Sequence, residues 1–266
     1  MEQAVYITRI EDLTRININS YSRLYFGHEF CERLLPSLEK LEEALKFALK
    51  NNFHFTFLTP YVTNEGIKKV NILLDFLARE APQSEVVFND YGVFRLLRNN
   101  YSVLKPVMGR LLNRMKRDPR IINIYQLLPE SARRYFKGFS LDVPAFRDFL
   151  LKNDVTRVEL DNVFQGIDLN ISFLGFSASL YIPYAYITTT RACLAINCDV
   201  HGMEDIVGIF PCKKECQKYT FYLRSRAMPV MLIRKGNTIF MKNEKVADDI
   251  EEKGVDRIVH EIDIPI

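Results

Sequence analysis

The stretch that decides the fold runs from residue 53 to residue 92 and reads FHFTFLTPYVTNEGIKKVNILLDFLAREAPQSEVVFNDYG. It begins with a short apolar run, residues 53–58, which predicts a strand that ends before Pro60. The apolar residues of 67–77 recur with the period of a helix. Residues 85–88 predict a second strand, which stops at the turn sequence Asn89-Asp90-Tyr91-Gly92. This order of strand, helix and strand is typical of a parallel βα unit.

The same alternation continues on both sides of this stretch. Upstream, residues 20–26 predict a strand, and Ser37 opens an amphipathic helix over 38–49. Downstream, strands are expected at 105–112, 155–160 and 168–174, with helices beginning at 93 and spanning 143–151. Strands at this spacing, separated by helices, predict a TIM-like (β/α) barrel, complete or incomplete.

The last third of the chain has a different character. Residues 193–216 are dense in Cys, Gly and charge. Residues 218–224, 228–234 and 238–241 then predict a β meander with a hairpin turn at Lys235-Gly236-Asn237, before a helix at 247–252 and a final strand at 257–262. We therefore expect one barrel domain over 1–266, with the cysteine loop and a β-rich insertion after it at about 188–243.

Composition narrows the classes of function. The 266 residues are 48% hydrophobic, enough for a large core, and the net charge of +3 is too small by itself to indicate nucleic-acid binding. No segment approaches the roughly 18 apolar residues of a membrane span, and the first residues lack the pattern of a signal peptide. A cytoplasmic location is expected, where thiols stay reduced. An odd number of cysteines, five, does not indicate a disulfide framework and raises metal binding instead.

The positions of the cysteines favour a metal centre at one end of the barrel. Cys212 and Cys216 form a C-x3-C pair, Cys193 precedes them, and Cys31 follows the first predicted strand. The carboxyl ends of barrel strands gather on one face, which brings Cys31 and the late cysteines to the same rim. Four thiolates suit a four-iron cluster or zinc. Zinc sites usually combine two close pairs, so one pair with two scattered cysteines fits a cluster somewhat better. The alternative is that these cysteines are small buried hydrophobic residues.

Several short segments, in this order, resemble the iron–sulfur proteins of the U32 peptidase family. They are LYFGHEFC at 24–31, VFNDYGV at 87–93, GRLLNR at 109–114 with Asp118-Pro119-Arg120, TRAC at 190–193, and the C-x3-C pair. The resemblance covers about residues 20–240. It implies a barrel that holds a 4Fe-4S cluster on Cys31, Cys193, Cys212 and Cys216, with Cys198 as an alternative to Cys193.

Within this family, one early and three late cysteines are similar to the pattern of the smaller subunit of a pair that supports oxygen-independent hydroxylation in ubiquinone biosynthesis. This resemblance implies an oxygen-independent modification of a quinone precursor or an RNA base, with a related cluster-bearing subunit as partner. A non-catalytic scaffold subunit, with a cluster or zinc, is the second hypothesis. A peptidase is the third, although the sequence contains neither a His-Glu-x-x-His nor a Gly-x-Ser-x-Gly motif.

Further candidate residues have two readings each. Asn89 and Asp90 end a strand on the expected active face, where they bind substrate or satisfy the turn. Arg191, next to Cys193, is a candidate for binding an anion or tuning the cluster potential. The basic residues Arg110, Arg114, Lys116, Arg117 and Arg120 are expected to grip an anionic substrate or to form a solvated face. His28 and His201 are expected near the cysteine rim as hydrogen-bond donors or as ordinary loop residues.

Overall fold

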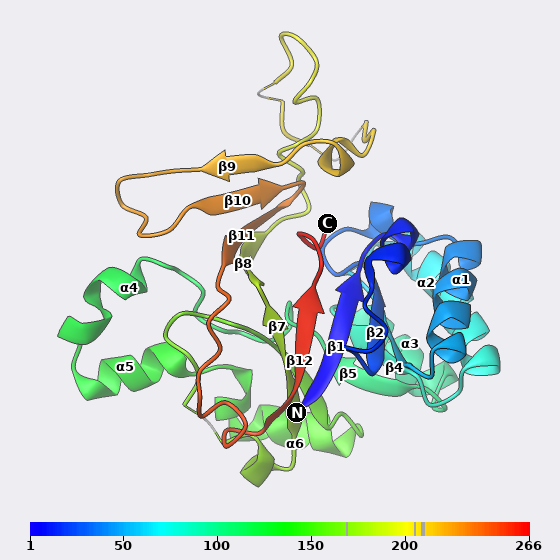
Figure 1. Cartoon of the computed structure of the whole chain (residues 1–266), viewed down its shortest axis with the longest axis horizontal. Coiled ribbons are helices and arrows are strands. Elements are labelled where there is room, and N and C mark those ends of the chain that lie inside the picture. The colour runs from blue at the N-terminus through cyan, green and yellow to red at the C-terminus, as the bar shows by residue number, and fades with distance from the viewer. Residues whose placement is uncertain (169, 205, 209–210) are drawn as a thin grey trace.

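The computed structural model describes residues 1–266 except 169, 205, 209 and 210. Within these described residues, eight parallel strands close into a barrel in the order β1-β12-β7-β6-β5-β4-β3-β2 (Figure 1). The predicted TIM-like α/β barrel is therefore confirmed. The barrel strands are β1 Glu2–Ile7, β2 Arg23–Gly27, β3 His54–Leu58, β4 Glu85–Phe88, β5 Lys105–Met108, β6 Arg157–Asp161, β7 Ser177–Ile182 and β12 Val255–Glu261.

Helices cover part of the outside of the barrel. Those that connect the early strands gather on one side of it (Figure 1). Side chains cap two of them, because Ser37 Oγ accepts a hydrogen bond from the backbone of Lys40 and Thr63 Oγ1 accepts one from Gly66. Their apolar faces join one large core with the outward side chains of the strands. The α-helices are α1 Leu38–Lys50, α2 Asn64–Glu80, α3 Tyr91–Asn100, α4 Ile121–Ile124, α5 Glu130–Lys137 and α6 Pro144–Lys152.

The inside of the barrel is filled in layers, as closed parallel barrels require. In the middle, the rings of Tyr6 and Tyr25 each meet the ring of Tyr181 edge-on, with centroids 6.1 and 6.0 Å away. At the end where the strands begin, Arg257 pairs with Glu85 at 2.7 Å. At the end where they finish, a second buried ion cluster forms around Arg110. The barrel is therefore a packed core and not an open channel.

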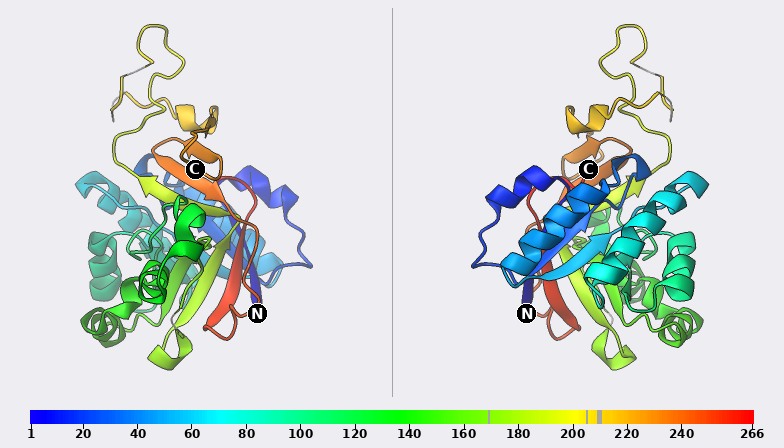
Figure 2. Two further views of the ribbon diagram at one scale, coloured as in Figure 1. Left: turned by 90° about the vertical axis from the view of Figure 1, so that its left-hand side faces the viewer. Right: turned by 90° about the vertical axis from the view of Figure 1, so that its right-hand side faces the viewer.

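A second, antiparallel sheet lies beyond the carboxyl end of the barrel strands (Figures 1 and 2). Its order is β8-β11-β10-β9, and Gly236-Asn237 forms the turn between β10 and β11, as expected. The expected insertion lay wholly after the cysteine loop, but β8 precedes that loop, so the sheet brackets it. Its strands are β8 Tyr184–Thr189, β9 Phe221–Leu223, β10 Leu232–Lys235 and β11 Thr238–Lys242.

Three other expectations need correction. The strand expected at 105–112 ends at Met108, because the backbone turns to place Arg110 inside the barrel mouth. Of the strand expected at 168–174, residue 169 lies outside the described residues, and a 3-10 turn covers Ser172–Leu174, before β7. Residues 248–254 form turns and not a helix. In the described part of the chain, no helix combines the length and apolarity needed to cross a bilayer.

Candidate metal centre

Four cysteines from distant parts of the chain line one small pocket, which we call the cysteine pocket. They are Cys31, Cys193, Cys212 and Cys216. The remaining wall is apolar or cationic apart from one amide, Asn237. It consists of Arg33, Leu34, Arg191, Ile196, Gly236, Asn237 and Ile266. The structure thus brings together the four positions that the sequence nominates as ligands.

Local structure explains how each cysteine reaches the pocket. Cys31 stands just beyond β2, at the start of a 3-10 turn over Glu32–Leu34. Cys193 is held by an isolated antiparallel bridge to Gly208, with a hydrogen bond of 2.7 Å from its N–H to the Gly208 carbonyl. Between Cys212 and Cys216, Lys214 adopts the left-handed conformation with φ of 60° and precedes a second 3-10 turn. This reversal lets both ends of the C-x3-C loop face the same pocket.

Glu215 ties the two late cysteine segments to each other. Its side chain is buried, with 3% exposure. One carboxylate oxygen accepts a hydrogen bond from the backbone N–H of Asn197 at 3.3 Å, and the other accepts one from Lys213 at 3.1 Å. The loop after Cys193 and the loop after Cys212 therefore share one anchor. The sequence analysis did not identify Glu215, although its position between Cys212 and Cys216 was a signal that could have indicated it.

The absence of a side chain at Gly236 makes room for Cys216. Gly236, in the turn between β10 and β11, has φ of +58°, a conformation that other residues rarely adopt. A Cβ atom there would lie 3.0 Å from Cys216 Cβ and 3.7 Å from its sulfur. The turn and the cysteine loop can approach this closely only because residue 236 has no side chain.

Cys198, the alternative ligand to Cys193, does not line the cysteine pocket. It lies half-buried in a turn after Ala195, where the charges nearest to its thiol belong to Asp199, Glu215 and Arg234. The geometry therefore favours Cys193 over Cys198 as a member of the set.

The electrostatics of the pocket oppose free thiolates. Burial raises the pKa of the Cys31, Cys193 and Cys216 thiols, that of Cys216 to about 11. Negative charge on the neighbouring cysteines raises the pKa of each thiol further, while hydrogen bonds from the backbone of Arg33 to Cys31 and of Ala195 to Cys193 lower it. Thiolates that share such a pocket need a positive centre between them, which a bound metal supplies.

The donors of the cysteine pocket are four thiols, which do not form a site for a single ion as they stand. Among the residues that the structure describes, no three His, Cys, Asp or Glu side chains form a group that could hold one metal ion. One zinc ion draws its sulfurs to about 2.3 Å from a single point. In a four-iron cluster each thiolate binds a different iron atom, so the sulfurs stand farther apart. Arg33 and Arg191 in the wall would offset the net negative charge of a thiolate-bound cluster.

A larger cavity of about 400 Å³, the adjoining cavity, opens beside the cysteine pocket. Cys31, Arg33, Arg191 and Asn237 line both spaces. Phe30, Tyr61 and Val62 contribute apolar surface, and Lys69 contributes a further cation. This volume lies in the range of small-molecule sites.

The charges of the adjoining cavity favour an anionic ligand. Glu32 is occupied by Thr63, whose backbone N–H donates to the carboxylate at 2.6 Å and whose hydroxyl lies 3.0 Å away. Glu65 pairs with Lys68 at 2.7 Å. The guanidinium of Arg191 lies 5.6 Å from the centre of the Tyr61 ring and donates to the Val62 carbonyl at 3.4 Å. With its acids engaged locally, the cavity presents Arg191 and Lys69 to a ligand.

Asn237 joins the second sheet to the wall between the two spaces. Its side-chain amide donates to the Phe30 carbonyl at 2.6 Å and to the Thr190 carbonyl at 2.7 Å, and it lies 2.8 Å from the Tyr61 hydroxyl. Sequence reasoning placed Asn237 only in a hairpin turn. Its role depends on contacts with residues far away in the chain, which no local pattern reveals.

Asn89 and Asp90 serve the turn after β4. The Asn89 side chain donates to the Thr59 carbonyl at 3.0 Å and accepts from the Leu111 N–H at 3.0 Å. Asp90 caps α3, where its carboxylate accepts from Gly92 at 2.6 Å and from Val93 at 3.3 Å. Neither residue lines the cysteine pocket or the adjoining cavity. These contacts favour the turn reading, and substrate binding by either residue stays a prediction.

Arg110 is buried completely in the mouth of the barrel. Its guanidinium binds Glu29, reaches Asp161 at 3.2 Å and Glu261 at 3.0 Å, and lies 3.8 Å from the centre of the Tyr181 ring. Burial raises the pKa of Glu261 to about 8, against the opposing charge of Arg110. The side chain that was expected to grip a substrate therefore has protein partners on every side. The carboxylates that hold it lie at the ends of strands or shortly after them.

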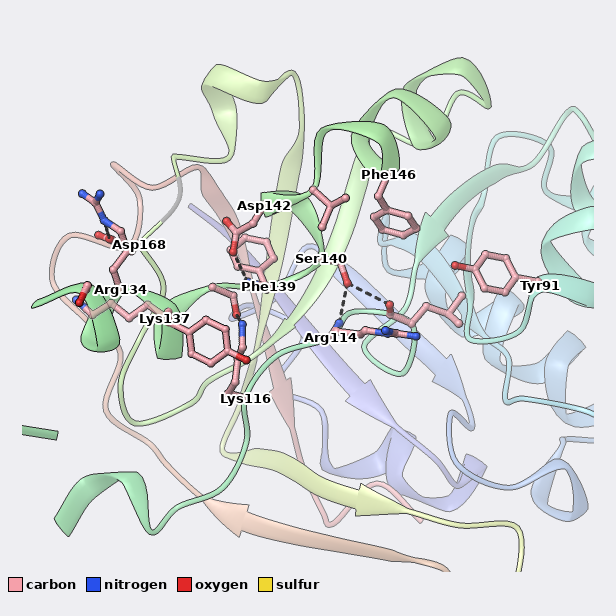
Figure 3. A pocket seen from close by; sticks show the side chains of 15 residues that line it. Tyr91, Arg114, Lys116, Arg134, Lys137, Phe139, Ser140, Asp142, Phe146 and Asp168 are labelled. Carbon is pink, nitrogen blue, oxygen red and sulfur yellow. Dashed lines mark hydrogen bonds and ion pairs between the residues drawn. The ribbon is translucent and has the colours of Figure 1, made fainter. Parts of the chain in front are cut away.

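The rest of the basic run separates. Arg117 joins the buried cluster through Asp161 at 2.8 Å, and Arg120 pairs with Asp118 on the surface. Arg114 and Lys116 line a different cleft, away from the cysteines (Figure 3). His28 is buried, which lowers its pKa to about 3, and His201 is exposed. Neither histidine lines the cysteine pocket.

Comparison with known proteins adds likeness of shape only. No family model and no curated protein matches the chain. A U32 peptidase structure, Mk0906, aligns with 13% identity over 100% of this chain and 94% of that chain, with a TM-score of 0.49. The chitooligosaccharide complex of YKL-39 aligns with 10% identity over 98% of this chain and 92% of that chain, with a TM-score of 0.32. A GH18 chitinase from Cycas revoluta aligns with 10% identity over 98% and 94% of the two chains, with a TM-score of 0.33. At these scores the likeness assigns no activity to this chain.

Proposed function

We propose that this chain is an iron–sulfur protein whose 4Fe-4S cluster is bound by Cys31, Cys193, Cys212 and Cys216. The observation that carries the proposal is the convergence of these four cysteines, from three separate segments, on one pocket. Random burial of free cysteines gives no reason for such convergence. Cys198, the remaining cysteine, lies outside the pocket and provides an internal control.

The proposed role of the cluster is redox chemistry on a small molecule. When bound, such a cluster supplies one-electron transfer. The adjoining cavity supports a small anionic substrate, since Cys31 lines both spaces and Arg191 and Lys69 face a ligand there. A cavity of about 400 Å³ suits a single small molecule better than a length of RNA.

The reaction type, an oxygen-independent hydroxylation, rests on the resemblance of the glycine, asparagine and cysteine motifs to U32-family iron–sulfur proteins. In this reaction a C–H bond would be replaced by C–OH with water as the oxygen donor, two protons released to solvent, and two electrons passed one at a time to an external acceptor. We propose further that a related cluster-bearing subunit works with this chain. In this scheme Arg191 holds the anionic group of the substrate near Cys31, and Phe30 and Val62 exclude water from its apolar part.

Metal and sulfide analysis of protein purified without oxygen tests the cluster. We expect about four irons and four sulfides per chain, with absorption near 400 nm. Serine substitution of Cys31, Cys193, Cys212 or Cys216 is expected to reduce the iron content strongly. Cys198→Ser is the matched control and should keep it.

Other outcomes have a definite meaning. One zinc per chain would contradict the cluster and leave a structural metal subunit. Equal loss of iron in Cys198→Ser and Cys193→Ser would contradict the assigned ligand set. Full iron content in all the single variants would show that these four cysteines are not the ligands.

Arg191→Gln tests the proposed position of the cluster beside the adjoining cavity. Removing a cation from the wall of the cysteine pocket disfavours the reduced, more negative cluster, so the midpoint potential should fall. Iron content should stay unchanged, because Arg191 is not a ligand. A redox titration of wild type, Arg191→Gln and the distant control Arg114→Gln measures the shift. An unchanged potential in Arg191→Gln would place the cluster elsewhere.

A further inference from the structure

A wide cleft with a basic wall lies away from the cysteines and has no part in the function proposed above. Its volume is about 1040 Å³, and it shares no lining residue with the cysteine pocket or the adjoining cavity. The loop at 112–116, α5, the segment 138–143 and the start of α6 form it, and Tyr91 at the start of α3 closes one side (Figure 3). We call it the basic cleft.

Cations outnumber carboxylates in the basic cleft. Four basic side chains line it, from Arg114, Lys116, Arg134 and Lys137, against the two carboxylates of Asp142 and Asp168. Both carboxylates have partners in the protein. Asp142 accepts a hydrogen bond from the Phe139 N–H at 2.8 Å, and Asp168 pairs with Arg134 at 3.3 Å. An excess of positive charge therefore remains at the wall.

Three of the four cations form no ion pair with another described residue. Lys116 donates to the Gly138 carbonyl at 3.1 Å and lies 4.4 Å from the centre of the Tyr135 ring, so it is held in place. The side chains of Arg114 and Lys137, in contrast, make no ion pair or hydrogen bond with another described residue. Arg114 is anchored only through its backbone N–H, which donates to Ser140 Oγ at 2.8 Å. A fixed backbone with an unpaired guanidinium is suited to an anionic ligand.

Aromatic rings accompany these cations. Tyr91 and Tyr135 are 51% and 65% exposed, and Phe146 also lines the cleft. Figure 3 shows Arg114, Phe146 and Tyr91 toward one side, and Lys137, Arg134 and Asp168 toward the other. Exposed rings beside unpaired cations match a ligand that combines a flat ring with a negative group.

We propose that the basic cleft binds a nucleotide. Its phosphates would meet Arg114 and Lys137, and its base would pack on an aromatic ring of the wall. A bare anion would make no use of the rings, and a neutral aromatic compound would leave the cations unused. A single strand of nucleic acid usually follows rings spaced along an open groove. Here the rings and cations gather around one cleft of ligand size.

Calorimetric titration of the purified full chain with AMP, ATP, adenosine, inorganic phosphate and a short adenine oligonucleotide tests the proposal. We expect AMP and ATP to bind more tightly than adenosine or phosphate alone. Arg114→Gln should weaken AMP binding about tenfold, the loss of one hydrogen bond between charged groups. Lys137→Gln should weaken the binding of ATP, whose longer phosphate chain reaches toward the other side of the cleft, by a similar factor. Lys69→Gln, which removes a cation from the adjoining cavity, should leave AMP binding unchanged.

Each result that contradicts nucleotide binding has its own meaning. Phosphate that binds as tightly as AMP would reduce the cleft to a bare anion site. An oligonucleotide that binds far more tightly than AMP would make it a nucleic-acid surface. Absence of binding by every probe, or affinities for AMP and ATP that are the same in both variants as in wild type, would overturn the proposal. Thermal unfolding of each variant confirms that the fold is retained, and Phe146→Leu offers a second variant that tests the ring without changing charge.

Discussion

At the scale of single residues, the candidate centre depends on side chains that bind no ligand themselves. Glu215 is the clearest case, because one buried carboxylate holds backbone N–H groups from two loops. Asn237 anchors the wall shared with the adjoining cavity by donating to the backbone carbonyls of Phe30 and Thr190. Hydrogen bonds thus position the segments next to the cysteines, and so bring the four thiols to one pocket.

Glu215→Ala is expected to weaken this anchor. Hydrogen bonds to a charged group contribute about 1.5–3 kcal/mol each, so we expect a loss of about 2 kcal/mol or more in the free energy of unfolding. We also expect a lower iron content, because the Cys193 and Cys212 segments lose their common partner. Chemical denaturation and iron analysis measure both effects.

The matched control is Glu204→Ala, which removes an exposed carboxylate from the same region. The free energy of unfolding and the iron content of Glu204→Ala should both match those of wild type. Normal iron content together with normal stability in Glu215→Ala would show that the two loops hold their places without the carboxylate.

At the scale of secondary-structure elements, caps decide how the strands connect to the helices. Asp90 ends the loop after β4 and begins α3 through two backbone hydrogen bonds. Asp90→Ala should therefore cost about 1 kcal/mol of stability, as caps usually do, and Asp90→Asn should cost less. Ser37→Ala, at the cap of α1, provides a comparison of similar size.

Iron content separates the two readings of Asp90. As a cap, Asp90→Ala lowers the unfolding temperature and leaves iron content and cluster potential as in wild type. Loss of a cluster property at unchanged stability would instead support a role in the site.

Periodicity predicted the central elements well and the edges of the fold less well. The runs that became β3, α2 and β4 have strong apolar patterns and are covered by a large core. β1 was missed, because its residues look ordinary until β12 and β2 pair with both of its edges. Turns stand where a helix was expected at 247–252. A local pattern of apolar residues does not show where the neighbouring strand, β12, must begin.

The sequence likewise predicted one part of the candidate site and not another. The convergence of the cysteines followed from barrel topology, which places strand ends on one face. The burial of Arg110 did not, because its partners Glu29, Asp161 and Glu261 lie at or just beyond the ends of three strands that meet only in three dimensions. A basic run in a sequence does not reveal which of its members turns inward.

At the scale of the whole molecule, the buried ion cluster in the barrel mouth predicts a dependence of stability on pH. Burial raises the pKa of Glu261 to about 8, from an unfolded value near 4.5. A carboxyl group with a raised pKa stabilises the fold most below the unfolded pKa, and this contribution is lost as pH rises through the folded pKa. Its contribution should therefore decrease between about pH 4.5 and pH 8.

Urea unfolding at pH 6.0 and pH 8.5 measures this effect. Wild type should lose more stability between the two pH values than Glu261→Gln, which cannot release a proton. Glu11→Gln, an exposed carboxylate, is the control and should behave as wild type. Equal pH dependence in wild type and Glu261→Gln would show that Glu261 keeps the same protonation across this range.

The closure of the barrel also sets a timetable for the newly made chain. β1 pairs with β12, and Ile266 completes the wall around the cysteines. Cys31 follows β2, yet its pocket is complete only once β12 and Ile266 have taken their places. Until these distant segments meet, the Cys31 thiol is exposed in the folding chain. In the function proposed above, iron and sulfide would therefore enter a barrel that has already closed, and the thiol would need protection until then.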